Sequence, residues 1–192
     1  MISKVTNGIT SWLIRCKAID EADRELYEYA VHSLWLNIAP IFLVLLLGGV
    51  MGRIKEGILL IIPFLAIRKY AGGFHAKKER NCLVSSSVLL ALCVYLTGLL
   101  TYGIVLNSLV IVSIISLMVF SPIDTENRRL DAEEKKRYKF LTCVLVLIVA
   151  VVYLMLVMCH AYNYAVCIAI GIMLSAGVQV PCILRRIMKI EY

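Results

Sequence analysis

The sequence predicts an all-α, polytopic membrane protein with six transmembrane helices and an N-terminal amphipathic interfacial helix. The 192 residues are 61% hydrophobic and only 17% charged, whereas soluble domains average roughly 45–50% apolar and about 25% charged residues. The charged residues form a few short blocks between long apolar runs. No block is long enough to bury a core of its own. We therefore expect one integral membrane domain over 1–192, with a six-span bundle at 34–184.

Residues 1–30 are expected to lie at the membrane surface. Apolar residues, Trp12 among them, recur at helical spacing over 1–19, and polar or basic residues fall mainly between them. This pattern is typical of an amphipathic helix whose cations meet anionic lipid head groups. It fits equally well a helix that packs on the rest of the protein. The N-terminus has no apolar core followed by a small-residue cleavage site, so we expect no removable signal peptide.

Six apolar runs follow, and five of them reach the roughly 17–25 residues that a membrane helix needs. The second run is shorter and contains Pro63. It reaches span length only by including Arg68–Phe74, or else it forms a re-entrant half-helix; we favour the full crossing. The six runs are Leu34–Met51, Gly57–Ile67, Leu83–Tyr102, Ile104–Phe120, Phe140–Cys159 and Tyr164–Leu184.

The distribution of Lys and Arg predicts the orientation of these spans. With six crossings and a cytoplasmic N-terminus, eighteen of the twenty Lys and Arg residues face the cytoplasm, and only Arg53 and Lys55 lie outside. This is the excess of cytoplasmic cations that the positive-inside rule predicts. Both termini are therefore expected inside the cell. The net charge of +7 is explained by topology and anionic lipid rather than by nucleic acid.

The cysteines do not form a structural framework. The chain has seven Cys residues, an odd number, and no C-x-x-C pair. Four of them lie within apolar runs, where cysteine behaves as a small hydrophobic residue. A disulfide scaffold or a zinc cluster is therefore not expected, and we expect no metal and no cofactor.

The segment whose side chains most clearly suggest a reactive site is 68–82, which reads RKYAGGFHAKKERNC. It contains one of the three histidines, His75, and ends at Cys82. Nearby positive charge or a helix N-terminus lowers the pKa of a thiol from about 8.5 and so favours the reactive thiolate. Cys82 is the cysteine in this chain for which both influences are expected.

Helix geometry limits what His75 and Cys82 can do together. In one straight helix their Cα atoms would lie about 10 Å apart along the axis, whereas a nucleophile and its base must come within about 3 Å. The pair Gly72-Gly73 permits a sharp bend, and Asn81 is a suitable N-cap. We therefore predict that His75 lies on a loop folded back over Cys82, in the first turn of the third span.

Two loops resemble those of the AgrB family, the accessory gene regulator proteins of Gram-positive quorum sensing. The first is YAGGFHAKKERNC at Tyr70–Cys82, and the second is SPIDTENRRLDAEEKKRYK at Ser121–Lys139. The resemblance implies a cysteine endopeptidase with His75 and Cys82 as its catalytic dyad. Its substrate would be a small precursor peptide with an amphipathic leader and an acidic tail. The tail is cut off and the product is cyclised to a thiolactone or a lactone.

The basic loops are then candidates for binding the acidic tail. The candidate substrate-binding residues are Arg68, Lys69, Gly72, Gly73, Lys77, Lys78, Arg80, Arg128 and Arg129. The cations among them are equally explained as topology determinants at the head groups. No third catalytic residue can be assigned, although Glu79 and Asn81 are near His75 in the chain. A homodimer is one arrangement that would enclose a peptide between spans.

Two other functions compete with this interpretation. A non-enzymatic transporter or exporter of a small peptide would also be polytopic, but no span carries the interior charge that marks ion pathways. The polar residues of the spans are small hydroxyls and amides, such as Asn107 and Gln179 near the ends. A different protease is disfavoured because the chain lacks HExxH and GxSxG motifs.

Overall fold

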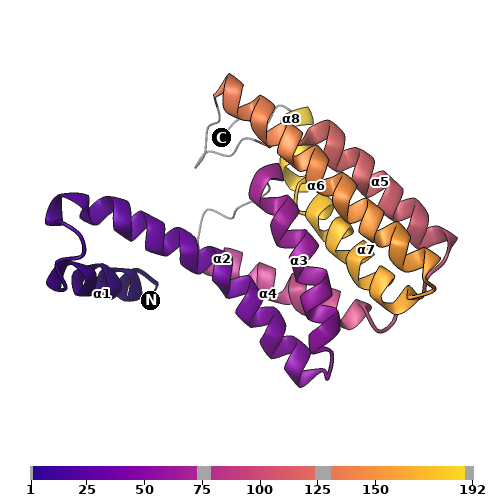
Figure 1. The fold of residues 1–192 in the computed structure, drawn as a ribbon, viewed down its shortest axis with the longest axis horizontal. Coiled ribbons are helices and arrows are strands. Elements are labelled where there is room, and N and C mark those ends of the chain that lie inside the picture. Colours follow the sequence, from indigo (N-terminus) through magenta and orange to yellow (C-terminus); the bar gives the residue numbers. More distant parts are fainter. Residues whose placement is uncertain (1, 73–78, 124–130, 189–192) are drawn as a thin grey trace. The chain divides into compact units, whose positions relative to one another are not determined.

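A computed structural model describes residues 2–72, 79–123 and 131–188, and all regular structure in these ranges is helical. Figure 1 shows the order of the elements. The chain forms two compact units, Met1–Phe42 and Leu43–Tyr192, which are described separately below. The helices are α1 (Ile2–Arg15), η1 (Glu21–Asp23), α2 (Arg24–Val50), α3 (Ile54–Ala71), α4 (Glu79–Leu96), α5 (Ile104–Phe120), α6 (Ala132–Met158), α7 (Tyr162–Gly177) and α8 (Val180–Ile187).

All six predicted apolar runs are mostly helical, and α5 has the predicted bounds. The run Leu83–Tyr102 is helical only to Leu96, and the run Tyr164–Leu184 is divided between α7 and α8. The helix α6, however, begins at Ala132 rather than at Phe140. Its charged first turns are made of good helix formers, and the backbone N–H of Asp131 donates to Glu134 Oε2 at 3.2 Å. Such reciprocal capping satisfies a backbone donor that the helix leaves free. The prediction took the first apolar residue as the start of the helix and therefore placed that start too late.

Two helices in the described ranges are long and apolar enough to cross a bilayer. They are Ala132–Met158 and the segment Tyr162–Leu184, which joins α7 to α8. Three further helical stretches are apolar but shorter: Ile38–Val50, Ser85–Leu96 and Ile104–Phe120. The helix α3 has 18 residues, which span about 27 Å, and it carries charges at both ends. The six crossings remain a prediction.

From Phe140 onward, the surface of α6 is strongly apolar. Exposed aliphatic side chains of this kind, gathered on one helix, mark contact with lipid or with another protein. The exposed residues are Leu147, Ile148, Val151, Val152, Leu154, Met155 and Met158.

The first unit contains α1, η1 and the start of α2. Arg24 donates from Nη2 to Ser11 Oγ at 2.9 Å, and hydrogen bonds to Glu21 and Glu28 raise the pKa of its guanidinium. Thr6 and Thr10 are buried, whereas Ile9 and Trp12 are exposed. The exposed apolar residues favour the interfacial interpretation of α1. The predicted interfacial segment 1–30 is too long, because α1 ends at Arg15 and residues 24–30 belong to α2.

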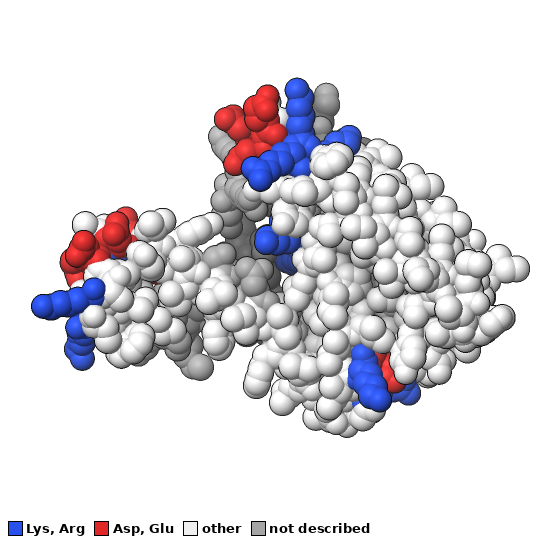
Figure 2. All heavy atoms as spheres, viewed as in Figure 1, with Lys and Arg blue, Asp and Glu red and all other residues white. Residues whose placement is uncertain are grey.

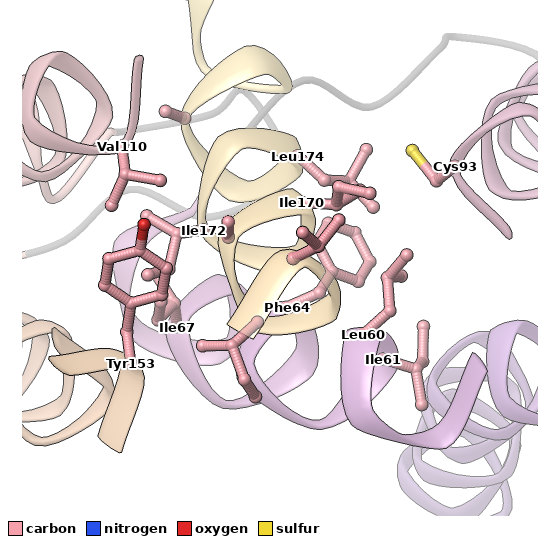
Figure 3. Packing of buried hydrophobic residues seen from close by; sticks show 14 of the residues in the cluster. Leu60, Ile61, Phe64, Ile67, Cys93, Val110, Tyr153, Ile170, Ile172 and Leu174 are labelled. Carbon is pink, nitrogen blue, oxygen red and sulfur yellow. The ribbon is translucent and has the colours of Figure 1, made fainter. Parts of the chain in front are cut away.

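The second unit is built around α7. All residues from Ala165 to Ile172 are buried, because α3, α5 and α6 all pack on this helix. Figure 3 shows side chains of α3 and α7 meeting in the core, with Val110 and Tyr153 on one side of α7 and Cys93 on the other. A helix that is apolar on every face is expected in just such a central position.

Polar and aromatic side chains meet where α5 and α7 begin. Tyr153 of α6 donates its hydroxyl to Asn107 Oδ1, and Asn107 Nδ2 donates to the Tyr102 hydroxyl at 3.0 Å. The rings of Tyr102 and Tyr162 stack with centroids 4.7 Å apart. These contacts join α5, α6 and α7 at one end of the bundle.

Gly171 permits a close approach of α7 to α3. A Cβ atom at this position would lie 2.6 Å from the Leu60 carbonyl oxygen and 2.7 Å from Pro63 Cγ. Both distances are shorter than real Cβ contacts, and one of the two neighbours is backbone. The two helices can therefore pack this closely only with glycine at residue 171.

We predict that Gly171→Ala lowers the stability of the bundle by about 1–3 kcal/mol, the usual cost of overpacking. The measurement is thermal unfolding of the detergent-solubilised protein. Gly177→Ala is the matched control, because this glycine ends the same helix and a Cβ there meets nothing within 4 Å. Equal unfolding midpoints for the two variants would contradict the proposed close packing.

Candidate functional site

Along the chain, the predicted site residues lie at the end of α3, between α3 and α4, at the start of α4, and between α5 and α6. His75, Gly73, Lys77 and Lys78 lie outside the described residues, as do Arg128 and Arg129. Cys82 and Arg80 belong to α4, but their side chains lie outside what the structure describes. The His75–Cys82 distance therefore remains a prediction.

Cys82 is the fourth residue of α4, which already includes Glu79. The predicted N-cap at Asn81 is therefore wrong, since Asn81 lies inside the helix. Cys82 is three positions after Glu79 along the helix, a rise of about 4.5 Å. Cys82 thus lies in the first described turn of α4, as the sequence predicted. The predicted loop 68–82 is partly helical, because α3 continues to Ala71 and α4 includes Glu79–Cys82.

The last turn of α3 holds the first two basic candidates. Arg68 is partly buried, with its guanidinium 5.4 Å from the centroid of the Phe64 ring. Lys69 is exposed, with Nζ 5.3 Å from the centroid of the Tyr70 ring. The aromatic rings stabilise both positive charges. Lys69 remains accessible to an anion.

Gly72 ends α3 in a conformation that favours glycine. Its φ is +72°, and its N–H donates to the Arg68 carbonyl oxygen at 3.2 Å. A Cβ atom here would lie 2.6 Å from the carbonyl oxygen of Ile123. Gly72 was expected to bind substrate, but its described contacts are those of a tight chain turn.

The starts of the two basic loops lie side by side. The backbone N–H of Ile123, just after α5, donates to the Ala71 carbonyl oxygen at 3.0 Å. The rings of Tyr70 and of Tyr138 in α6 have centroids 5.9 Å apart. The first loop leaves the helices at Ala71 and the second at Ser121, so the two loops predicted to act together start from one place.

A buried amide completes this junction, and the sequence analysis gave it no role. Gln179 Nε2 donates to the Ala71 carbonyl oxygen at 3.0 Å and to Ser121 Oγ at 2.8 Å. Gln179 and Ser121 are both buried. The available signal was an amide two residues before Pro181, close to the end of the last apolar run. An amide in such a place needs polar partners.

Within the second unit, charged side chains gather in separate groups, with a largely uncharged surface between them (Figure 2). Over 2–72, 79–123 and 131–188, no three His, Cys, Asp or Glu side chains lie close enough to hold a metal ion.

Comparison with known proteins gives the family. The family model for Accessory gene regulator B matches residues 6–180. An AgrB-like protein of Clostridium acetobutylicum is 33% identical over 101 residues, covering 52% of this chain and 48% of the relative. AgrB-like protein 2 of Clostridium perfringens is 25% identical over 127 residues, covering 62% of this chain and 59% of the relative.

An AgrB-like protein of Listeria monocytogenes serotype 4a is 25% identical over 120 residues, covering 62% of this chain and 58% of the relative. The matched part of the chain thus spans less than two thirds of the length of each relative. No solved structure matches the chain. The family match, together with two apolar helices of membrane length, indicates a membrane protein. Since the family model covers nearly the whole sequence, the chain belongs to the accessory gene regulator B (AgrB) family.

Proposed function

We propose that this protein is a membrane-embedded cysteine endopeptidase that removes the C-terminal tail of a small precursor peptide and promotes its cyclisation to a quorum-sensing signal. Membership of the AgrB family over residues 6–180 carries the proposal, since this range contains both His75 and Cys82. The position of Cys82 in the first described turn of α4 supports it. Free N–H groups and the helix dipole at such a position favour a thiolate.

The proposed reaction proceeds through a thioester. His75 takes the proton of Cys82, and the thiolate attacks the scissile carbonyl carbon. The tetrahedral oxyanion then collapses, the C–N bond breaks, and the imidazolium of His75 protonates the leaving amine. A thiol or hydroxyl within the precursor next attacks the thioester and gives its proton to His75. The ring closes as a thiolactone or a lactone, and Cys82 leaves as the thiolate.

The energetics of these steps require a dry site. Exchange between a thioester and a thiolactone changes the free energy little, whereas conversion of an amide to a thioester raises the free energy. Water must therefore be kept from the thioester, and loss of the cleaved tail draws the reaction forward. Lys69 is an exposed cation near Ala71 and is suited to attract an acidic tail.

The proposed membrane arrangement has six spans, with both termini and the active site on the cytoplasmic side. Trp12 and Ile9 are exposed on α1, which suits contact with anionic lipid at the same surface. A precursor with an amphipathic leader would concentrate there. The bilayer would then bring the leader and the basic loops together.

The first test is tail cleavage in cells that contain the chain and a short precursor with an internal Cys or Ser and an acidic tail. We expect Cys82→Ala and His75→Ala to reduce cleavage, followed by mass spectrometry, by about 10²-fold or more, the usual contribution of a nucleophile or base. Cys93→Ala in the same helix is the matched control, since Cys93 is buried in the core. Cleavage at the wild-type rate by Cys82→Ala would exclude the dyad, and an exporter would retain transport in both variants.

The second test concerns topology. Cys16 and Cys159 are both exposed, but the six-span arrangement places them on opposite sides of the membrane. A membrane-impermeant maleimide is expected to label Cys159 in intact cells and Cys16 only after permeabilisation. The variants Cys159→Ser and Cys16→Ser identify each label. Equal labelling of Cys16 in intact cells would overturn the orientation.

The third test concerns Gly72. Gly72→Ala places a side chain where φ is +72° and where Cβ would lie 2.6 Å from Ile123 O, so the start of the first loop must shift. We expect tail cleavage to fall by about 10–100-fold, because small misplacements near a reacting centre are costly. Gly49→Ala is the control, since a Cβ there meets nothing within 4 Å. Unchanged cleavage by Gly72→Ala would show that the conformation at Gly72 does not matter for the site.

A further inference from the structure

Gln179 connects three parts of the chain that are far apart in sequence. Its Nε2 atom is hydrogen-bonded to Ala71, 108 residues away, and to Ser121, 58 residues away. Ala71 ends α3, Ser121 follows α5, and Gln179 lies between α7 and α8. One side chain thus joins the places where both basic loops leave the helices.

The Ala71 carbonyl is the centre of this arrangement. It accepts the Gln179 amide at 3.0 Å and the Ile123 N–H, also at 3.0 Å. A carbonyl oxygen has two lone pairs, so both contacts can be made together. Ala71 is 1% exposed and Gln179 0% exposed, so neither contact competes with water.

Stability alone does not explain an amide in this place. Gln179 Oε1 is buried and has no hydrogen-bond partner among the residues that the structure describes, and an unsatisfied buried atom costs about 1–3 kcal/mol. A half-satisfied polar group is less favourable than an apolar side chain of the same shape. Positions that break this rule are often functional sites.

We propose that Gln179 is a positioning residue for the peptidase reaction, acting by holding the starts of the two basic loops together. This inference rests on the proposed function. His75 is four residues after Ala71 in the chain. Even a fully extended chain of this length spans only about 14 Å, so the position of Ala71 limits where His75 can be. The contact with Ser121 holds the start of the second loop at the same point.

The main variant is Gln179→Met, which keeps much of the side-chain length and volume but removes both donated hydrogen bonds. The Ala71 carbonyl keeps its contact with Ile123, so no new unpaired carbonyl results. We expect kcat for tail cleavage to fall by about tenfold or more, since a displacement of about 1 Å can cost more than this. KM for the precursor should change by less than about twofold, because the lost interaction acts on the chemical step.

A second readout separates positioning from general damage. The rate of iodoacetamide modification at Cys82, followed by mass spectrometry of its peptide against pH, reports how far the imidazole promotes the thiolate. We expect the profile of Gln179→Met to move toward that of His75→Ala. Ser175→Ala is the matched control: Ser175 is buried on α7, and its hydroxyl donates to the carbonyl oxygen of Gly171 in the same helix at 2.9 Å. It should leave kcat and the profile unchanged.

Three results would overturn the inference. Wild-type kcat in Gln179→Met would do so directly. A loss of activity accompanied only by a lower unfolding midpoint, with an unaltered Cys82 profile, would show a purely structural role. If His75→Ala itself left the Cys82 profile unchanged, the proposed dyad would fail, and the inference with it. Should Gln179→Met not accumulate in the membrane, Ser121→Ala removes one of the two acceptors, and a reduced kcat with a shifted profile is again required.

Discussion

The close contact between α3 and α7 is the constraint on which the rest of the bundle depends. Lipid is as apolar as a leucine side chain, so membrane helices associate through tight packing and polar contacts rather than through hydrophobic burial. Gly171 lets the backbone of α7 approach Leu60 and Pro63 of α3. This contact fixes how far α7 extends along α3. It therefore decides where Gln179 meets the Ala71 carbonyl.

The proposed chemistry needs a rigid scaffold at the starts of the two loops. A nucleophile and its base must come within about 3 Å, and loops reach such accuracy only when a stable scaffold positions their ends. Here Ala71 is held by two hydrogen bonds, and Gly72 turns the chain against Ile123. The start of the first loop is thus fixed by contacts with the second loop and with the end of α7.

The sequence predicted the helices well because apolar runs report directly on lipid-facing or buried surface, and α5 agrees residue for residue. It predicted helix starts poorly where charged residues continue the helix, as at Arg24 and Ala132. For the site, the sequence placed Cys82 in the first turn of α4 but wrongly made Asn81 its cap. The role of Gln179 could not be predicted, since its partners lie 58 and 108 residues away and no local pattern links them.

Polar side chains at both ends of α5 complete the explanation of how the bundle keeps its register. Smooth apolar helices can slide past one another at little cost, whereas a buried hydrogen bond is lost by a shift of about one residue, or 1.5 Å. At the start of α5, Asn107 joins Tyr102 and Tyr153. At its end, Ser121 joins Gln179. These contacts hold the start of α5 against α6 and its end against α3 and the residues that follow α7. The first loop, which begins after Ala71, and the second loop, which begins at Ser121, therefore start at a fixed separation.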